Sequence, residues 1–147
     1  MSKRISFRGK IDSGLEERIR LGTLDGKRGY RIVKFQAMDS EPGTAHYETV
    51  VKVYAKSQGS ASGTVDFSES DLLAAIYMQD NSDASYPMSE AIIFDNEIFN
   101  QDIYVTSEGL TGTHPTSFYL EVETVKLSDV QATQLTLKNL RTIASRS

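Results

Sequence analysis

The chain has 147 residues, no cysteine and a formal net charge of −4 at pH 7. Its length fits one domain with a sizeable core, and the lack of cysteine excludes disulfide bonds and thiolate metal sites. The negative charge disfavours a protein whose main task is to hold nucleic acid, because DNA repels an acidic surface unless basic residues gather on one face. We therefore expect a single domain over residues 1–147 with no nucleic-acid partner.

A basic bias occurs early in the chain, and we interpret it as the solvated faces of strands. It comprises Lys3, Arg4, Arg8, Lys10, Arg18, Arg20, Lys27, Arg28, Arg31 and Lys34. No secretion signal is evident, since Ile5–Arg8 is not an apolar run. The longest apolar run, Leu72–Met78, is far too short to span a bilayer. We expect a protein with no membrane partner that is made in the cytoplasm of its producer.

Alternating apolar and polar residues over Ile5–Ile11 predict a half-buried strand. A second strand is expected over Glu17–Thr23. Asp25-Gly26 then predicts a hairpin, because a type I′ turn needs positive φ at both central residues. The return strand, Gly29–Met38, has apolar residues on both faces, which predicts a central place in a sheet.

The next strand is expected over Tyr47–Lys56, followed by a flexible polar loop at Ser57–Gly63. The stretch Ser70–Gln79 is ambiguous. Asp71 could cap a short helix, whereas Ile76–Met78 is typical of a buried strand. We favour a strand over the second half.

The stretch Met88–Thr106 predicts two strands joined by a polar turn or bulge, within which Ile98 and Phe99 are expected to be buried. The polar residues of this segment are Asp95, Asn96, Glu97, Asn100, Gln101 and Asp102. Ser107–Ser117 contains glycines, a proline and several hydroxyl residues, and we expect a long loop there. The last clear strand is Phe118–Leu127.

The tail predicts a helix, because Ser128-Asp129 can cap one and apolar or small residues follow at helical spacing. These residues are Val130, Thr133, Leu137, Leu140 and Ala144. A strand through Thr133–Leu137 remains open. About eight short strands without βαβ alternation predict an all-β fold, an antiparallel β-sandwich that is jelly-roll-like, with a short C-terminal helix packed on the sheets or projecting from them.

Signals for catalysis are weak. His46 and His114 lie beside predicted loops, no G-x-S-x-G motif is present, and Gly22–Lys27 is too short for a phosphate loop. Glu121 and Glu123 share a strand face, as paired glycosidase carboxylates sometimes do, but outward-facing strand charges give the same pattern. We expect no enzyme, no catalytic residue and no cofactor.

Two acidic clusters suggest calcium, since carboxylates and amides are the hard oxygen ligands that this ion prefers. They are Asp80/Asn81/Asp83 and Asp95/Asn96/Glu97/Asp102. Neither spacing matches an EF-hand, and we interpret both as turn-forming side chains rather than metal ligands. Binding of calcium or a glycan by a loop stays open.

Several segments together resemble one family. They are Ile19–Met38, Val50–Lys56, Val65–Met78, Ile93–Thr106 and Phe118–Arg141, and the most distinctive parts are NEIFNQDIYVT and FYLEVE…ATQLTLKNLR. In this order they are similar to small virion structural proteins of tailed bacteriophages, especially marine ones. The resemblance implies a β-sandwich or jelly-roll subunit displayed in many copies on the particle, without catalysis.

We therefore expect a virion structural protein, synthesised in the host cytoplasm, that decorates or cements the capsid. Its partners would be other copies of itself in a symmetric homo-oligomer and other virion proteins. The alternative is a tail or neck binding module for host adhesion or carbohydrate. The chain ends are expected to supply interface residues, namely Arg4, Phe7, Leu137, Leu140 and Ile143.

Overall fold

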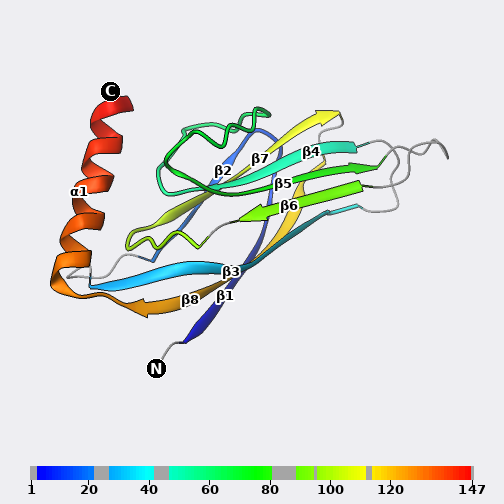
Figure 1. Ribbon diagram of the computed structural model, residues 1–147. Helices are drawn as coiled ribbons and strands as arrows, with labels where there is room; N and C mark the ends of the chain where they lie inside the picture. Colours follow the sequence, from blue (N-terminus) through cyan, green and yellow to red (C-terminus); the bar gives the residue numbers. More distant parts are fainter. Residues whose placement is uncertain are drawn as a thin grey trace.

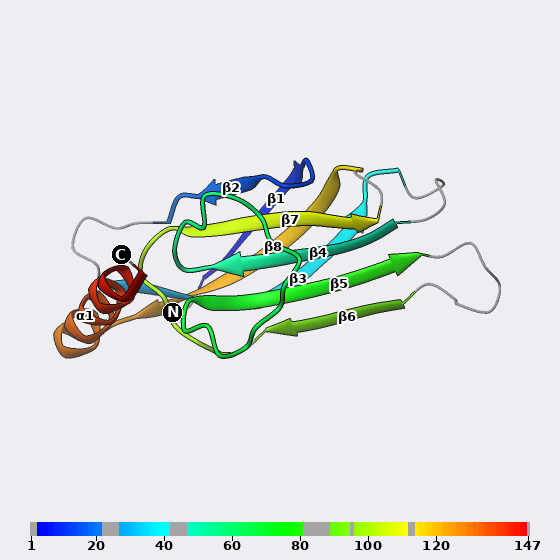
Figure 2. The same ribbon diagram turned by 90° about the horizontal axis from the view of Figure 1, so that it is seen from above.

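The computed structural model describes residues 3–21, 27–41, 47–80, 89–94, 96–111 and 114–146. Within these residues, eight β-strands form two antiparallel sheets that pack face to face, and one α-helix follows the last strand (Figures 1 and 2). The elements are β1 (Arg4–Ile11), β2 (Glu16–Ile19), β3 (Arg28–Asp39), β4 (Tyr47–Tyr54), β5 (Leu72–Asp80), β6 (Ser89–Phe94), β7 (Ile103–Thr111), β8 (Thr116–Lys126) and α1 (Asp129–Arg146). The predicted all-β sandwich with a C-terminal helix is confirmed.

One sheet has three strands in the order β1-β8-β3, and the other has five in the order β2-β7-β4-β5-β6. The pairs β1–β8, β2–β7 and β4–β5 are nested along the chain, as when a long hairpin rolls up into a jelly roll. The sixth strand departs from that scheme, because β6 pairs with β5 and not with β3. The fold is jelly-roll-like, with one strand transferred to the larger sheet.

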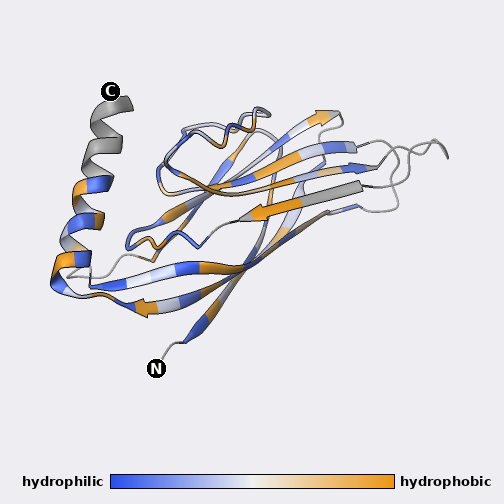
Figure 3. Ribbon diagram, viewed as in Figure 1, coloured by the Kyte–Doolittle hydropathy of each residue, from blue (hydrophilic) through white to orange (hydrophobic). Residues whose placement is uncertain are grey.

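Strand β8 shows why these sequences form sheets. Thr116, Phe118, Leu120 and Val122 are buried at every second position, and the residues between them are partly exposed. A period of two places one face on the core and the other toward solvent. Hydrophilic and hydrophobic residues also alternate along β1 (Figure 3). Fully buried apolar side chains between the two sheets include Phe35, Val51, Val53, Ile76, Ile103, Val105, Leu120 and Val122.

The hairpin predicted from Glu17–Thr23 and Gly29–Met38 is wrong. The two strands belong to different sheets, since β2 pairs with β7 and β3 pairs with β8. Asp25-Gly26, on which the prediction rested, lies outside the described residues. A local turn signal cannot decide such pairing, because burial along the whole strand also selects the partner.

Strand β3 lies at an edge of its sheet among the described strands, and not at the centre as predicted. The free edge of its first half is nevertheless partly covered, because residues 96–100 run beside it. The Tyr30 N–H donates to the Phe99 carbonyl at 2.7 Å, and the Phe99 N–H donates to the Tyr30 carbonyl at 2.9 Å. The two rings stack with centroids 6.2 Å apart. A crossing segment thus supplies the cover that a neighbouring strand would give.

The polar segment before β7, which was predicted to be a turn or bulge, is not a tight turn. Strands β6 and β7 on either side of it are separated in the sheet by β5 and β4, so residues 96–102 cross the end of the sheet. Phe99 is buried as predicted, and Ile98 is only partly buried.

The long loop predicted over Ser107–Ser117 is wrong at both ends, because residues 107–111 continue β7 and Thr116 begins β8. Ser107 and Thr116 are buried, and the Ser107 hydroxyl donates to Thr116 Oγ1 at 3.2 Å. Two hydroxyl side chains can occupy the interior because this hydrogen bond gives each oxygen a partner.

The ambiguous stretch Ser70–Gln79 forms a strand from Leu72 onward. Helix α1 begins as predicted. Ser128 Oγ accepts the Gln131 N–H at 3.2 Å, and Gln131 Oε1 accepts the Ser128 N–H at 3.0 Å. This reciprocal pair satisfies two N–H groups at the helix start. The helix projects at one end of the sandwich (Figure 1).

Candidate interaction surfaces

The outer face of the three-stranded sheet is basic. Because Phe7, Leu120 and Phe35 face the core, the alternate residues of each strand face outward. A register shift between Ile32 and Lys34 places both Arg31 and Lys34 on that side. We name this surface the basic face, and its charged residues are Arg4, Arg8, Lys10, Arg31, Lys34, Glu121 and Glu123. Five cations against two carboxylates leave three uncompensated positive charges in a chain that is acidic overall.

Cations on the flanking strands hold both carboxylates of the central strand. Arg31 donates through Nε and Nη2 to Glu123 Oε2 at 3.0 and 2.8 Å. Arg4 Nη1 lies 3.8 Å from Glu121 Oε1. Glu121 and Glu123 are therefore engaged in cross-strand pairs, which explains their spacing without glycosidase chemistry.

The other cations of the basic face are not neutralised. Lys34 Nζ lies 5.6 Å from the centroid of the Tyr119 ring. Arg8 and Lys10 are exposed and make no ion pair with any residue that the structure describes. These side chains can meet an acidic partner without first breaking an existing ion pair.

The outer face of the five-stranded sheet is partly covered by residues 55–71, which join β4 to β5 (Figure 2). Hydrogen bonds fasten this connection to β2 and the turn before it. The Ser57 hydroxyl donates to Glu16 Oε1 at 2.7 Å, and the Gln58 N–H donates to Glu16 Oε2 at 2.6 Å. The Ala61 N–H donates to the Gly14 carbonyl at 3.3 Å.

Lys52 is a buried cation beneath this connection, with 1% of its surface exposed. Its Nζ donates to the Thr64 carbonyl oxygen at 2.5 Å and lies 5.2 Å from the centroid of the Tyr54 ring. Desolvation by burial lowers the pKa of Lys52, and the Glu69 carboxylate opposes that shift. Thr106, in register with Lys52 on β7, has a buried hydroxyl without a hydrogen-bond partner among the described residues.

Carboxylates surround this covered region. We name them the acidic face, and they are Glu16, Glu48, Asp66, Glu69 and Glu108. Glu48 accepts a hydrogen bond from the Tyr77 hydroxyl at 2.8 Å, and this bond raises the pKa of Tyr77. Asp66 Oδ1 accepts from the hydroxyl and the N–H of Ser68 at 2.6 and 2.9 Å, and these bonds lower the pKa of Asp66.

The cations on this side do not cancel its charge. Lys52 is covered, Arg18 is paired with Asp102, and Lys56 lies toward the helix end of the molecule. Exposed apolar side chains lie among the carboxylates, namely Val65, Phe67 and Leu110.

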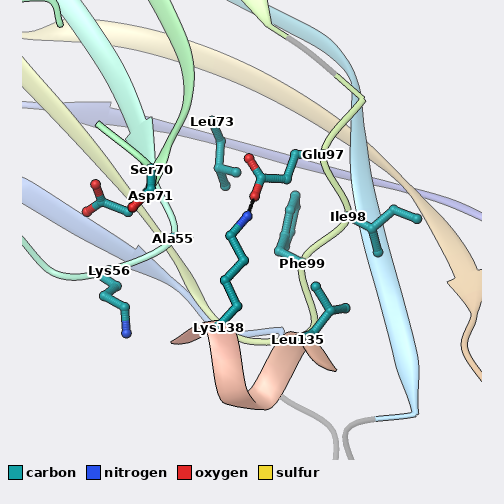
Figure 4. Close-up of a pocket in the computed structure, with 10 residues that line it drawn as sticks. All are labelled: Ala55, Lys56, Ser70, Asp71, Leu73, Glu97, Ile98, Phe99, Leu135 and Lys138. Atoms are coloured by element: carbon teal, nitrogen blue, oxygen red, sulfur yellow. Dashed lines mark hydrogen bonds and ion pairs between the residues drawn. The ribbon is translucent and has the colours of Figure 1, made fainter. Parts of the chain in front are cut away.

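A small pocket lies where α1 meets the sandwich (Figure 4). Leu73, Phe99 and Leu135 form apolar walls, and Lys138 of α1 makes an ion pair with Glu97. The space is about 20 Å³, enough for roughly one or two water molecules. The pocket is a packing defect at the helix junction rather than a site for an organic ligand.

The structure separates the predicted interface residues. Arg4 lies exposed on the basic face, whereas Phe7 is half-buried and packs against the core. Leu137 is 47% exposed on α1. The side chains of Leu140 and Ile143 lie outside the described residues. Their role in an interface stays a prediction.

The polar clusters noted in the sequence have ordinary partners where they are described. His114 Nδ1 lies 3.2 Å from Asp39 Oδ2. Asp102 accepts the Leu21 N–H at 2.7 Å and Arg18 Nε at 2.6 Å. His46, Asn81, Asp83 and Asp95, and the side chain of Asp80, lie outside the described residues. In the remainder, no group of His, Asp and Glu side chains is arranged to hold a metal ion.

Comparison with family models and with curated proteins assigns no family to the chain, because it matches none of them. Across the described ranges, no helix has both the length and the apolar character needed to cross a bilayer.

Sequence reasoning missed the acidic face, because its residues come from four separated segments that only the fold brings together. It also missed the burial of Lys52, whose position in β4 alternates outward. The one available signal was the run Val50–Tyr54, which is apolar on both sides of the lysine.

Proposed function

We propose that this chain is a virion structural protein, a capsid decoration or cement subunit that acts through contacts with other copies of itself and with other virion proteins. The observation that carries the proposal is the basic face, an exposed sheet surface on which Arg8, Lys10 and Lys34 make no ion pair with any residue that the structure describes. A sandwich presents such a surface on paired strands, so little ordering is needed on contact. The resemblance of its segments to virion proteins of tailed phages also supports the proposal.

In a symmetric particle, each contact can be weak. Many copies engage at once, so the array is held by multivalency rather than by any single interface. A subunit of this kind needs exposed recognition surfaces and no reactive centre.

The test is detection of the chain in purified particles of the phage that encodes it. Quantitative mass spectrometry should give a copy number that is a multiple of the number of symmetry-related positions in the capsid. Electron microscopy should give density on the capsid surface in which the sandwich can be traced. Particles that lack the chain refute the proposal.

A tail or neck binding module for host adhesion or carbohydrate is the second candidate. Phe67 favours it, because this ring is exposed on the connection between β4 and β5 and could stack on a sugar. Specific binding on a glycan array that Phe67→Ser abolishes would support this candidate. Particles should then also assemble normally when the chain is deleted.

A further inference from the structure

The two outer faces of the sandwich carry opposite charge, and we propose that copies of this chain associate head to tail, the basic face of one on the acidic face of the next. The inference deepens the proposed function and rests on it in one respect, that the chain acts by contact with other copies. It names the surfaces that would meet.

Charge selects this pairing over the alternatives. The basic face has an excess of three positive charges, and the acidic face has five carboxylates above one covered lysine. Two basic faces would repel each other, as would two acidic faces, whereas the unlike faces attract. Nucleic acid is a poorer occupant of the basic face, because Glu121 and Glu123 run down its central strand and would oppose phosphates.

Exposed apolar residues lie on both surfaces. Met38 is 64% exposed at the outward side of β3, and Phe67 and Leu110 are 64% and 48% exposed on the acidic side. Methionine and aromatic side chains are enriched in protein interfaces, where a few buried anchors supply most of the binding energy. We assign Met38 and Phe67 as anchors of the two faces.

Geometry makes the contact repeat. The two faces lie on opposite layers of the sandwich (Figure 1), so a copy that uses one face still presents the other. Such heterologous contacts close into a ring when the rotation between copies permits, and otherwise continue as a row. Either outcome would produce repeated subunits on a particle.

Sedimentation velocity of the full chain at about 0.01 M and about 1 M salt tests the pairing. Between these conditions the Debye length falls from about 30 to about 3 Å. We expect oligomers at low salt whose association weakens about tenfold or more at high salt. A wild-type chain that stays monomeric at low salt and high concentration overturns the inference, while its presence in particles would leave the proposed function standing.

Charge reversal identifies the faces. Arg8→Glu/Lys10→Glu and Glu48→Lys/Glu108→Lys should each be monomeric alone, and an equimolar mixture of the two should associate again, because each variant keeps the face that the other has lost. Circular dichroism and thermal melts establish that each variant is folded, and the single change Phe67→Ser should weaken association without loss of fold. A mixture that remains monomeric contradicts the pairing.

A matched control changes the net charge equally elsewhere. Arg28 and Lys126 face each other at the end of the three-stranded sheet and alternate away from its outer side. Arg28→Glu/Lys126→Glu should therefore leave association unchanged. If Arg8→Glu/Lys10→Glu instead abolishes binding of a fluorescent single-stranded oligonucleotide and leaves association intact, the basic face belongs to nucleic acid and the inference is wrong.

Discussion

Substitutions of Lys52 can separate two contributions to stability, that of its buried ammonium group and that of its packed aliphatic stem. Lys52→Met keeps an unbranched stem as long as that of the lysine and removes the ammonium, whereas Lys52→Ala removes both the stem and the ammonium. Replacing a buried charged group by an apolar one of similar volume is often neutral or stabilising. The Thr64 carbonyl that loses its donor belongs to an exposed residue that water can reach. We expect the free energy of unfolding of Lys52→Met to lie within about 1 kcal/mol of the wild-type value.

Lys52→Ala differs from Lys52→Met only in buried volume. Each buried methylene contributes about 0.8 kcal/mol, so the alanine variant should be less stable than the methionine variant by about 2–3 kcal/mol, with a further cost if the cavity does not collapse. Urea unfolding at pH 7, followed by circular dichroism, measures both differences. Equal stability of the two variants would show that the stem of Lys52 is not packed under residues 55–71.

The pH dependence of the free energy of unfolding gives a second comparison, between the wild type and Lys52→Met. Burial lowers the pKa of Lys52 below its ordinary value of 10.5. Between the lowered value and 10.5 the unfolded chain binds the proton more tightly than the folded chain, so folding becomes more favourable as pH rises. The wild type should gain stability relative to Lys52→Met over that window. No gain would contradict the burial of the ammonium.

Three further substitutions test particular contacts. Tyr77→Phe should cost about 1 kcal/mol through loss of the bond to Glu48. Because the pKa of Tyr77 is raised, the wild-type advantage should be complete below about pH 10 and should be lost as pH rises from there through the raised value. Equal stability of the two proteins in urea melts at pH 7 would argue against the bond. Thr106→Val removes a buried hydroxyl without a described partner and should stabilise by about 1 kcal/mol in the same melts; destabilisation would indicate a partner outside the described residues. Gly63→Ala would place a Cβ against Leu110 Cδ2, the end of a flexible side chain that is 48% exposed and can turn aside, so the free energy of unfolding should change by less than about 0.5 kcal/mol. A larger loss that Leu110→Ala removes in a double-mutant cycle would show that Leu110 is held in place.

The sequence predicted the strands better than their partners. Strand β8 is recognisable because its buried residues recur at every second position, a signal that lies within the strand itself. The pairing of β2 with β7 depends on residues far apart in the chain, and a local Asp-Gly signal carries no information about them. Glycines, a proline and several hydroxyl residues predicted a loop over Ser107–Ser117, although Ser107 and Thr116 form a hydrogen-bonded pair in the interior.

The two charged surfaces were harder to predict from the sequence than the strands. The cations of the basic face could be read from the chain, but their gathering on one side follows from the register of β1, β8 and β3. The partners of Glu121 and Glu123 likewise became visible only through that register. Lys52 alternates outward as a charged strand residue should, and its burial follows from the path of residues 55–71 over the sheet.

The place of β8 between β1 and β3 also sets a constraint on synthesis. Both outer strands of the smaller sheet are made before the only described strand that pairs with them, so a nascent chain that ends before Thr116 cannot form that sheet. Closing such long-range pairs is slow compared with local structure. The ribosome must therefore pass Lys126 and expose the whole of β8 before the sandwich can close.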